Sequence, residues 1–152
     1  MLSVAEQILF WSTGPEEFRF LSNFHMCQIK AAHDFVWPSA EHLFFGISAE
    51  FSADQDKIRL HIKHPAEAKK YARTIPKVDD WNEIKDATML YISRLKFEQN
   101  DDLKEMLLMT DGFELVHFAP WGDVYWGVNK EMKGENRQGK ILMQVREELR
   151  QR

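Results

Sequence analysis

The chain has 152 residues, 44% hydrophobic and 29% charged, with 20 basic against 24 acidic side chains and a net charge of −4. This length and composition suit one continuous core, so we expect a single domain over residues 1–152. The negative charge argues against a general duplex-DNA binder, which needs an excess of basic residues. One cysteine, Cys27, and the lack of HExxH and CxxC motifs exclude disulfide scaffolds and the usual zinc sites.

The apolar stretches are short. Leu43–Ile47, for example, is far below the ~18 residues that a membrane-spanning helix needs. The N-terminus also lacks the basic and apolar regions of a signal peptide. We therefore expect a cytoplasmic protein with no membrane partner.

The first third of the chain is predicted to be extended. Gln7–Trp11 has strand character, and Thr13–Pro15 is typical of a turn. Cys27–Ala31 and Asp34–Trp37 are predicted to pair as a hairpin around Ala32-His33.

Helical spacing follows in five segments. Ser39 is the expected N-cap of the first, and Asp80 begins the third with a capping-box spacing to Glu83. The five predicted helices are residues 40–50, 65–73, 80–99, 101–109 and 139–150. The third is expected to bury one face, formed by Trp81, Ile84, Thr88, Tyr91, Ile92 and Leu95.

A short strand, Leu115–Phe118, and a loop rich in tryptophan and glycine, residues 119–136, lie between the last two helices. The order of strands, then helices, then a returning strand predicts an α+β fold. The fold is expected to be mainly helical with a small antiparallel sheet.

The first candidate for chemistry is Glu41 in the first turn of a helix. Such a carboxylate is kept ionised by nearby N–H groups and the helix dipole, which suits it to stabilise a cation or orient water. The alternative is that Glu41 only helps to start the helix. His42 fits a packed or hydrogen-bonded histidine better than a catalyst.

The second candidate is the loop Pro120–Gly127. An indole beside Asp123 could stack on a flat heterocycle while the carboxylate faces its sugar. Alternatively, Trp121 and Trp126 fill the underside of the domain, and Trp81 is equally open to a core or a ligand role.

Two basic segments are candidates for phosphate binding. Residues 57–73 carry six lysines and arginines, and Asn136 and Arg137 precede the last helix. A solvated helix face and a turn with an N-cap explain them as well. Lys96, near the end of the third helix, needs no role beyond complementing the helix dipole.

The order and spacing of these segments resemble the YbiA-like or NADAR domain family over about residues 7–150. The resemblance implies an YbiA-like fold and no metal or cofactor. The matching segments are Phe20–Phe24, Trp37–His42 with Phe44, Trp81 with Lys85 and Met89, Lys96–Gln99, Leu107–Thr110, Asp123 with Tyr125–Gly127, and Asn136-Arg137 with Gly139, Leu142-Met143 and Arg146.

The resemblance implies hydrolysis of an N-glycosidic bond between a phosphorylated ribose and a base-like amine. Family members act on early riboflavin-pathway ribosylamino-pyrimidines, and others are associated with removing ADP-ribose from guanine in nucleic acid. The positions that it implies are catalytic Glu41 and Asp123, with substrate binding by Asn23, Trp81, Lys96, Trp126, Asn136 and Arg137.

The chain departs from the family pattern at three places. The family helix continues with glutamine and lysine where this chain has Phe45 and Ser48. A usual Leu-Val-Glu strand ends here in His117, and a Trp-Gly-x-Gly loop reads Trp126–Asn129. These changes indicate an altered substrate choice or a weakened activity.

The leading hypothesis is metal-independent hydrolysis through an oxocarbenium-like transition state, stabilised by Glu41 or Asp123. The substrate would be a small nucleotide-like molecule. One alternative is a module that captures ADP-ribose without cleaving it, motivated by the missing lysine at position 48. Another is removal of ADP-ribose from nucleic acid, which would be a partner only as that modified substrate.

Overall fold

The computed structural model describes residues 6–152, which fold as two compact units. The middle unit is Asn23–Asn100, and the terminal unit combines Met1–Ser22 with Asp101–Arg152. Helices dominate and the strands are few, which confirms the predicted α+β class.

A hairpin begins the middle unit. Strands β2 (Met26–Lys30) and β3 (Val36–Ser39) pair antiparallel, as predicted. The tip lies one residue later than expected, because the two residues with left-handed backbone are His33 (φ 61°) and Asp34 (φ 59°). Two consecutive positive φ values match the twist of a tight hairpin, and Asp and His tolerate them better than most residues.

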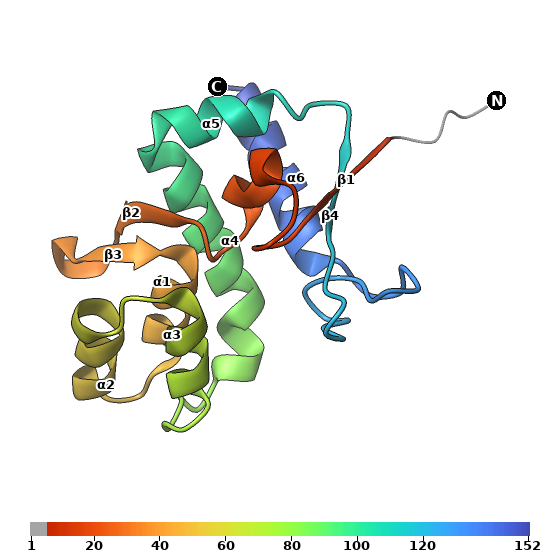
Figure 1. Ribbon diagram of the computed structural model, residues 1–152. Helices are drawn as coiled ribbons and strands as arrows, with labels where there is room; N and C mark the ends of the chain where they lie inside the picture. Colours follow the sequence, from red (N-terminus) through yellow and green to blue (C-terminus); the bar gives the residue numbers. More distant parts are fainter. Residues whose placement is uncertain (1–5) are drawn as a thin grey trace. The chain divides into compact units, whose positions relative to one another are not determined.

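Strand β2 lies beside the C-terminal end of helix α4 (Trp81–Gln99; Figure 1). The side chains of Gln99, the last residue of α4, and of Asn100, the next residue, cover its outer edge. The Gln99 amide accepts from the Lys30 N–H and donates to the Lys30 carbonyl, both at 2.7 Å. Asn100 donates to the Gln28 carbonyl at 3.1 Å. These amides occupy edge groups that would otherwise pair with another chain.

The other helical segments of the middle unit include two that the sequence did not predict, α2 and the π-helix η3. Both lack an apolar period, and Ile58 is their only buried side chain among the described residues. The segments are α1 (Ala40–Ser48), α2 (Ser52–Asp56), η3 (Lys57–His61) and α3 (Pro65–Ala72).

The long helix α4 begins where expected but without the predicted capping box. Asp80 has a backbone of φ −96° and ψ 19° and makes no side-chain cap bond, because a capping side chain needs an extended backbone. Tyr91 was expected on the buried face and is 43% exposed. The buried face is instead centred on Met89, Ile92 and Phe97.

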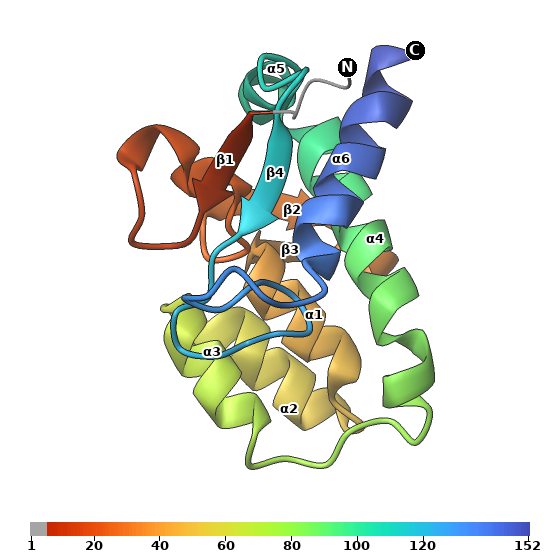
Figure 2. The same cartoon turned by 90° about the vertical axis from the view of Figure 1, so that its right-hand side faces the viewer.

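The terminal unit holds a second, parallel pair of strands, β1 (Gln7–Phe10) and β4 (Glu114–His117). Figure 2 shows them side by side, with α6 (Arg137–Arg150) running along β4. The unit also contains α5 (Asp101–Leu108) and a 3₁₀ segment, η1 (Glu16–Leu21), which was not predicted. The predicted antiparallel pairing therefore describes the hairpin, and the strands distant in sequence pair in parallel.

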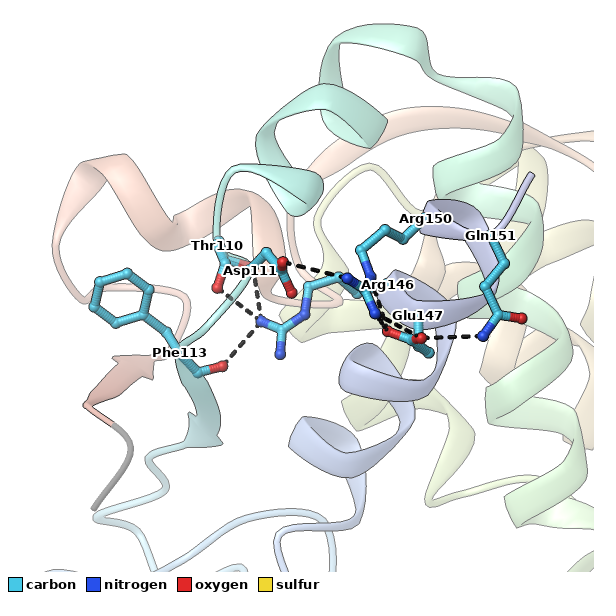
Figure 3. A network of polar contacts seen from close by, with 7 residues as sticks. All are labelled: Thr110, Asp111, Phe113, Arg146, Glu147, Arg150 and Gln151. Atoms are coloured by element: carbon cyan, nitrogen blue, oxygen red, sulfur yellow. Dashed lines mark hydrogen bonds and ion pairs between the residues drawn. The ribbon is translucent and has the colours of Figure 1, made fainter. Parts of the chain in front are cut away.

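Arg146 joins α6 to the turn between α5 and β4 (Figure 3). Its guanidinium donates to the Thr110 carbonyl at 2.8 Å, to the Thr110 hydroxyl at 3.1 Å and to the Phe113 carbonyl at 2.9 Å. Partial burial lowers the pKa of Arg146. This residue of the family pattern therefore anchors backbone carbonyls of the terminal unit.

Candidate active site

The sequence-predicted site residues fall into two sets, one in each unit. We call them the middle set and the terminal set. The middle set is Asn23, Glu41, Trp81 and Lys96, and the terminal set is Asp123, Trp126, Asn136 and Arg137.

Glu41 lies in the first turn of α1, half-buried. Ser39 is the N-cap, as predicted: its backbone is extended and its Oγ accepts the His42 N–H at 3.1 Å. The Glu41 N–H donates to the Asn23 carbonyl at 3.0 Å, and the Asn23 amide contacts Met89 Sδ at 3.4 Å. The structure thus brings Asn23 and Glu41 together at the N-terminus of α1, where an ionised carboxylate is favoured.

His42 is a fully buried, hydrogen-bonded residue, as the sequence indicated. Its Nε2 lies 2.9 Å from the Ile62 carbonyl, and its Nδ1 lies 2.6 Å from Ser39 Oγ. A carbonyl can only accept, so we assign the ring proton to Nε2, which leaves Nδ1 to accept the Ser39 hydroxyl proton. Burial lowers the pKa of His42, which favours this neutral form.

Trp81 is the first residue of α4 and is 8% exposed. Its ring lies 4.8 Å from the ring of Phe44, measured between centroids. Phe44 follows Glu41 by one helical turn, so Trp81 and Glu41 stand on neighbouring helices. The contact gives Trp81 a packing role, and its stacking on a ligand stays a prediction.

Lys96 is buried within α4, at 1% exposed. Its Nζ lies 5.2 Å from the centroid of the Phe97 ring. Desolvation lowers its pKa to about 8, although the nearby Cys27 thiol acts in the opposite direction. Lys96 was expected only to complement the helix dipole, but its side chain is buried and not exposed at the helix end. Its spacing of four residues from the apolar Ile92 is the feature of the sequence that indicates the buried face.

Two of the positions that depart from the family pattern, Phe45 and Ser48, lie on α1. Ser48 is fully buried, and its Oγ donates to the Phe45 carbonyl at 2.6 Å. Phe45 is half-buried, edge-on to Phe44. A Cβ added at Gly46 would overlap the Trp37 ring, so the indole fills the space beside this glycine. At the two positions where the family pattern has glutamine and lysine, Phe45 therefore packs against Phe44, and Ser48 bonds to a backbone carbonyl.

Asp123 organises its own loop. Its Oδ1 accepts the N–H of Tyr125 at 3.0 Å and that of Trp126 at 2.9 Å. Gly122, with φ 104°, makes the preceding turn. Two N–H groups on one carboxylate oxygen hold the loop as a helix cap holds a first turn.

Aromatic and cationic groups gather around the same loop. Arg137 lies over the Tyr125 ring at 4.3 Å, and Tyr125 packs edge-on to Trp126 with 4.9 Å between centroids. Arg137 also pairs with Glu135 at 3.1 Å. Trp126 is half-buried, whereas Trp121 is 55% exposed and does not fill the underside of the domain.

Asn136 is buried, and both ends of its amide bond to β4. Its Nδ2 donates to the Leu115 carbonyl at 2.9 Å, and its Oδ1 accepts the His117 N–H at 2.8 Å. Its φ of 49° is left-handed, which asparagine tolerates. Asn136 thus positions the start of α6 against β4, and a direct substrate contact stays a prediction.

The basic segment of residues 57–73 makes local contacts in the middle unit. Lys57 lies over the Tyr71 ring at 4.5 Å. Arg59 pairs with Asp56 at 3.2 Å and covers the Phe35 ring at 4.0 Å. Phosphate binding by this segment stays a prediction.

Along residues 6–152, every helix falls short of the combined length and hydropathy that a membrane-spanning segment needs. In the same part of the chain, no three His, Cys, Asp or Glu side chains group closely enough to hold a metal ion.

A family model described as the NADAR domain matches residues 9–150. The N-glycosidase YbiA of Escherichia coli is 33% identical over 144 residues, covering 93% of this chain and 88% of that protein. A riboflavin biosynthesis protein of Vibrio vulnificus is 33% identical over 98% of this chain, which spans only 40% of the length of that relative.

Solved structures give the same relationship. The NMR structure of the Escherichia coli protein YbiA matches this one with a TM-score of 0.84 and 32% sequence identity, covering 98% of this chain and 88% of that one. The segments that resembled the family therefore lie within a chain that matches it in sequence and in fold. This chain belongs to the NADAR domain family.

Proposed function

We propose that this protein is an N-glycosidase that hydrolyses the bond between C1 of a phosphorylated ribose and the nitrogen of a base-like amine. The observation that carries the proposal is similarity along nearly the whole chain to relatives named N-glycosidase. Other relatives are named riboflavin biosynthesis proteins, so a ribosylamino-pyrimidine of that pathway is the first substrate to test.

Glu41 is the proposed catalytic carboxylate. As the C1–N bond breaks, positive charge grows on C1 and the ring oxygen, and a fixed carboxylate nearby stabilises it. The water oxygen then bonds to C1, and one water proton ends on the departing nitrogen. A half-buried group at a helix N-terminus suits this role because it stays ionised and needs little reorganisation.

Asp123 is the second assignment for the same role. Its Oδ1 already receives two backbone N–H groups, which supports a structural task in the loop. Amide substitution separates the two assignments, because Asp123→Asn keeps an oxygen that accepts these bonds and removes only the charge.

The activity is tested by incubating the full chain with a panel of phosphorylated ribosylamines and ADP-ribosyl compounds and quantifying free base and free sugar phosphate by chromatography. We expect equal amounts of base and sugar phosphate from at least one ribosylamine. Absence of free base across the panel, under conditions where purified YbiA releases it, would contradict the proposal.

A second candidate function is capture of ADP-ribose without cleavage. The observation that favours it is Ser48, whose buried hydroxyl is bonded to the Phe45 carbonyl at a position where the family pattern has lysine. A rise in unfolding temperature with ADP-ribose and no released base over a long incubation would support this function over hydrolysis.

Removal of ADP-ribose from guanine in nucleic acid keeps the reaction and changes the substrate. The net charge of −4 disfavours it, since phosphate backbones attract basic surfaces. Chromatography of an ADP-ribosylated oligonucleotide before and after incubation distinguishes this substrate from a free ribosylamine.

A further inference from the structure

Two hydrogen bonds join Ser39 to His42, the residues that flank Ala40 and Glu41. The Ser39 Oγ accepts the His42 N–H at 3.1 Å and lies 2.6 Å from His42 Nδ1, to which it donates. Both side chains are fully buried. The residues on either side of Ala40 and Glu41 are therefore tied to each other by two bonds in opposite directions.

The pair is also tied to a second segment of the middle unit. His42 Nε2 donates to the carbonyl of Ile62, which directly follows the π-helix η3. This hydrogen bond therefore ties α1 to the carbonyl oxygen of the residue that follows η3. On the other side of Glu41, the Glu41 N–H reaches the Asn23 carbonyl, and the Asn23 amide reaches Met89 on α4.

We propose that Ser39 and His42 are positioning residues for the Glu41 carboxylate, acting through the first turn of α1. The inference rests on the proposed function, in which Glu41 stabilises charge at C1 of the sugar. A carboxylate in this role must be held within a fraction of an ångström, because small displacements lower the rate strongly. An N-cap that is itself locked by a buried histidine supplies that constraint.

The charges near the ring favour the neutral form that the pair needs. Ile62 lies between η3 and α3, and the titratable and charged groups from the start of η3 to the start of α3 are Lys57, Arg59, His61, Lys63 and His64. All are basic. Burial is the main cause that lowers the pKa of His42, the hydrogen bond to Ile62 acts in the opposite direction, and His64 lowers the pKa further. The strand before Ser39, β3, carries no titratable side chain. A protonated ring would remove the acceptor of the Ser39 hydroxyl proton.

The test is a double-mutant cycle between Ser39→Gly and Glu41→Gln in the full chain, read as kcat and KM for base release. Glycine is a tolerated N-cap residue, so Ser39→Gly removes the hydroxyl at little cost to the helix. We expect Ser39→Gly to lower kcat about 10-fold with KM changed less than about threefold. In the Glu41→Gln background we expect no further loss, because the group being positioned is already gone.

His42 is tested with the two amides that each replace one ring nitrogen. Asn places an amide near Nδ1 and keeps an acceptor for Ser39, whereas Gln places one near Nε2 and keeps a donor for Ile62. We expect His42→Asn to retain more of kcat than His42→Gln. The matched control is Ser93→Ala, at a buried serine of α4, which should leave kcat unchanged.

Four outcomes overturn parts of the account separately. Full activity of Glu41→Gln rejects the catalytic assignment and this inference with it. A loss in Glu41→Gln with none in Ser39→Gly, or equal losses from Ser39→Gly in both backgrounds, rejects only the positioning role. Amide hydrogen exchange tests the positioning role without an activity assay. Ser39→Gly should speed exchange at the Glu41 backbone amide, and an unchanged exchange rate would reject the proposal.

Discussion

The two units hold their candidate residues in different ways. In the middle unit, Glu41 is held through its own N–H and through the side chains of its neighbours, the N-cap Ser39 and His42 of α1. In the terminal unit, Asp123 accepts two N–H groups of its own loop, and Asn136, at the end of that loop, bonds two backbone groups of β4. Irregular backbone needs such partners, because its N–H and C=O groups lack a ladder.

The difference bears on which carboxylate does chemistry. The Asp123 carboxylate is tied to the shape of its loop by two backbone N–H groups. Glu41 stands in the first turn of a helix, where the helix dipole favours a negative charge. We therefore propose Glu41 for catalysis and Asp123 for loop structure.

The largest effect is expected from removing the charge of Glu41. Glu41→Gln should lower kcat about 100-fold or more, by analogy with other electrostatic catalysts, without changing the fold. The measurement is steady-state base release with circular dichroism as the check on folding.

Asp123→Asn is the matched variant for that experiment. We expect a loss of less than about fivefold, since the amide oxygen still accepts the two loop N–H groups. A large loss in Asp123→Asn together with full activity in Glu41→Gln would exchange the two roles and reverse the comparison.

The second effect concerns the stability of the terminal unit. Asn136→Ala removes two buried hydrogen bonds and places alanine at a φ of 49°, so we expect a loss of about 2–4 kcal/mol in the free energy of unfolding. Asn136→Gly removes the amide and relieves the backbone strain, so its loss should be smaller. Urea unfolding measures both.

The same titration tests whether residues 1–152 act as one domain. We expect a single cooperative transition, by fluorescence and by circular dichroism alike.

For the Asn136 prediction, a variant Asn136→Ala that is as stable as the natural chain would contradict the structural role of this amide.

The last effect is a dependence of the free energy of unfolding on pH, which arises from Lys96 in the middle unit. The pKa of Lys96 is lowered from 10.5 to about 8 in the folded chain, so between these values the unfolded chain binds more protons. Stability contributed by this group must therefore rise with pH from about 8 to 10.5, by about 3 kcal/mol at most.

Lys96→Met removes that dependence. The difference in unfolding free energy between the natural chain and Lys96→Met should grow in favour of the natural chain as the pH rises from 8 to 10, measured by urea unfolding. The exposed lysine variant Lys70→Met is the control and should follow the natural chain. A difference that stays constant with pH would show that Lys96 does not titrate in this range.

Regular elements were predictable because their apolar spacing is local. The N-cap Ser39, the helices beginning near Pro65 and Trp81 and the hairpin follow from spacing and turn chemistry. The short α2 and η3 were missed, since only Ile58 of their residues is buried. Parallel pairing of β1 with β4 joins distant segments, which no local pattern records.

The family pattern selects the candidate site residues as a set, and it does not separate their individual tasks. The family pattern selected Glu41 and Asp123 alike, but which backbone groups a carboxylate receives depends on the loop around it. Asn136 was selected as a ligand contact, and the structure shows its amide bonded to β4. Such tasks depend on tertiary contacts.

The central claim, attack of water at the sugar carbon, is tested most directly by running the reaction in ¹⁸O-labelled water and analysing both products by mass spectrometry after a short incubation. We predict more label in the sugar phosphate of the reaction than in unlabelled sugar phosphate incubated alongside, an unlabelled base, and product formation at least about 100-fold slower with Glu41→Gln. Label in the base, or release of product by Glu41→Gln at the rate of the natural chain, would contradict the account.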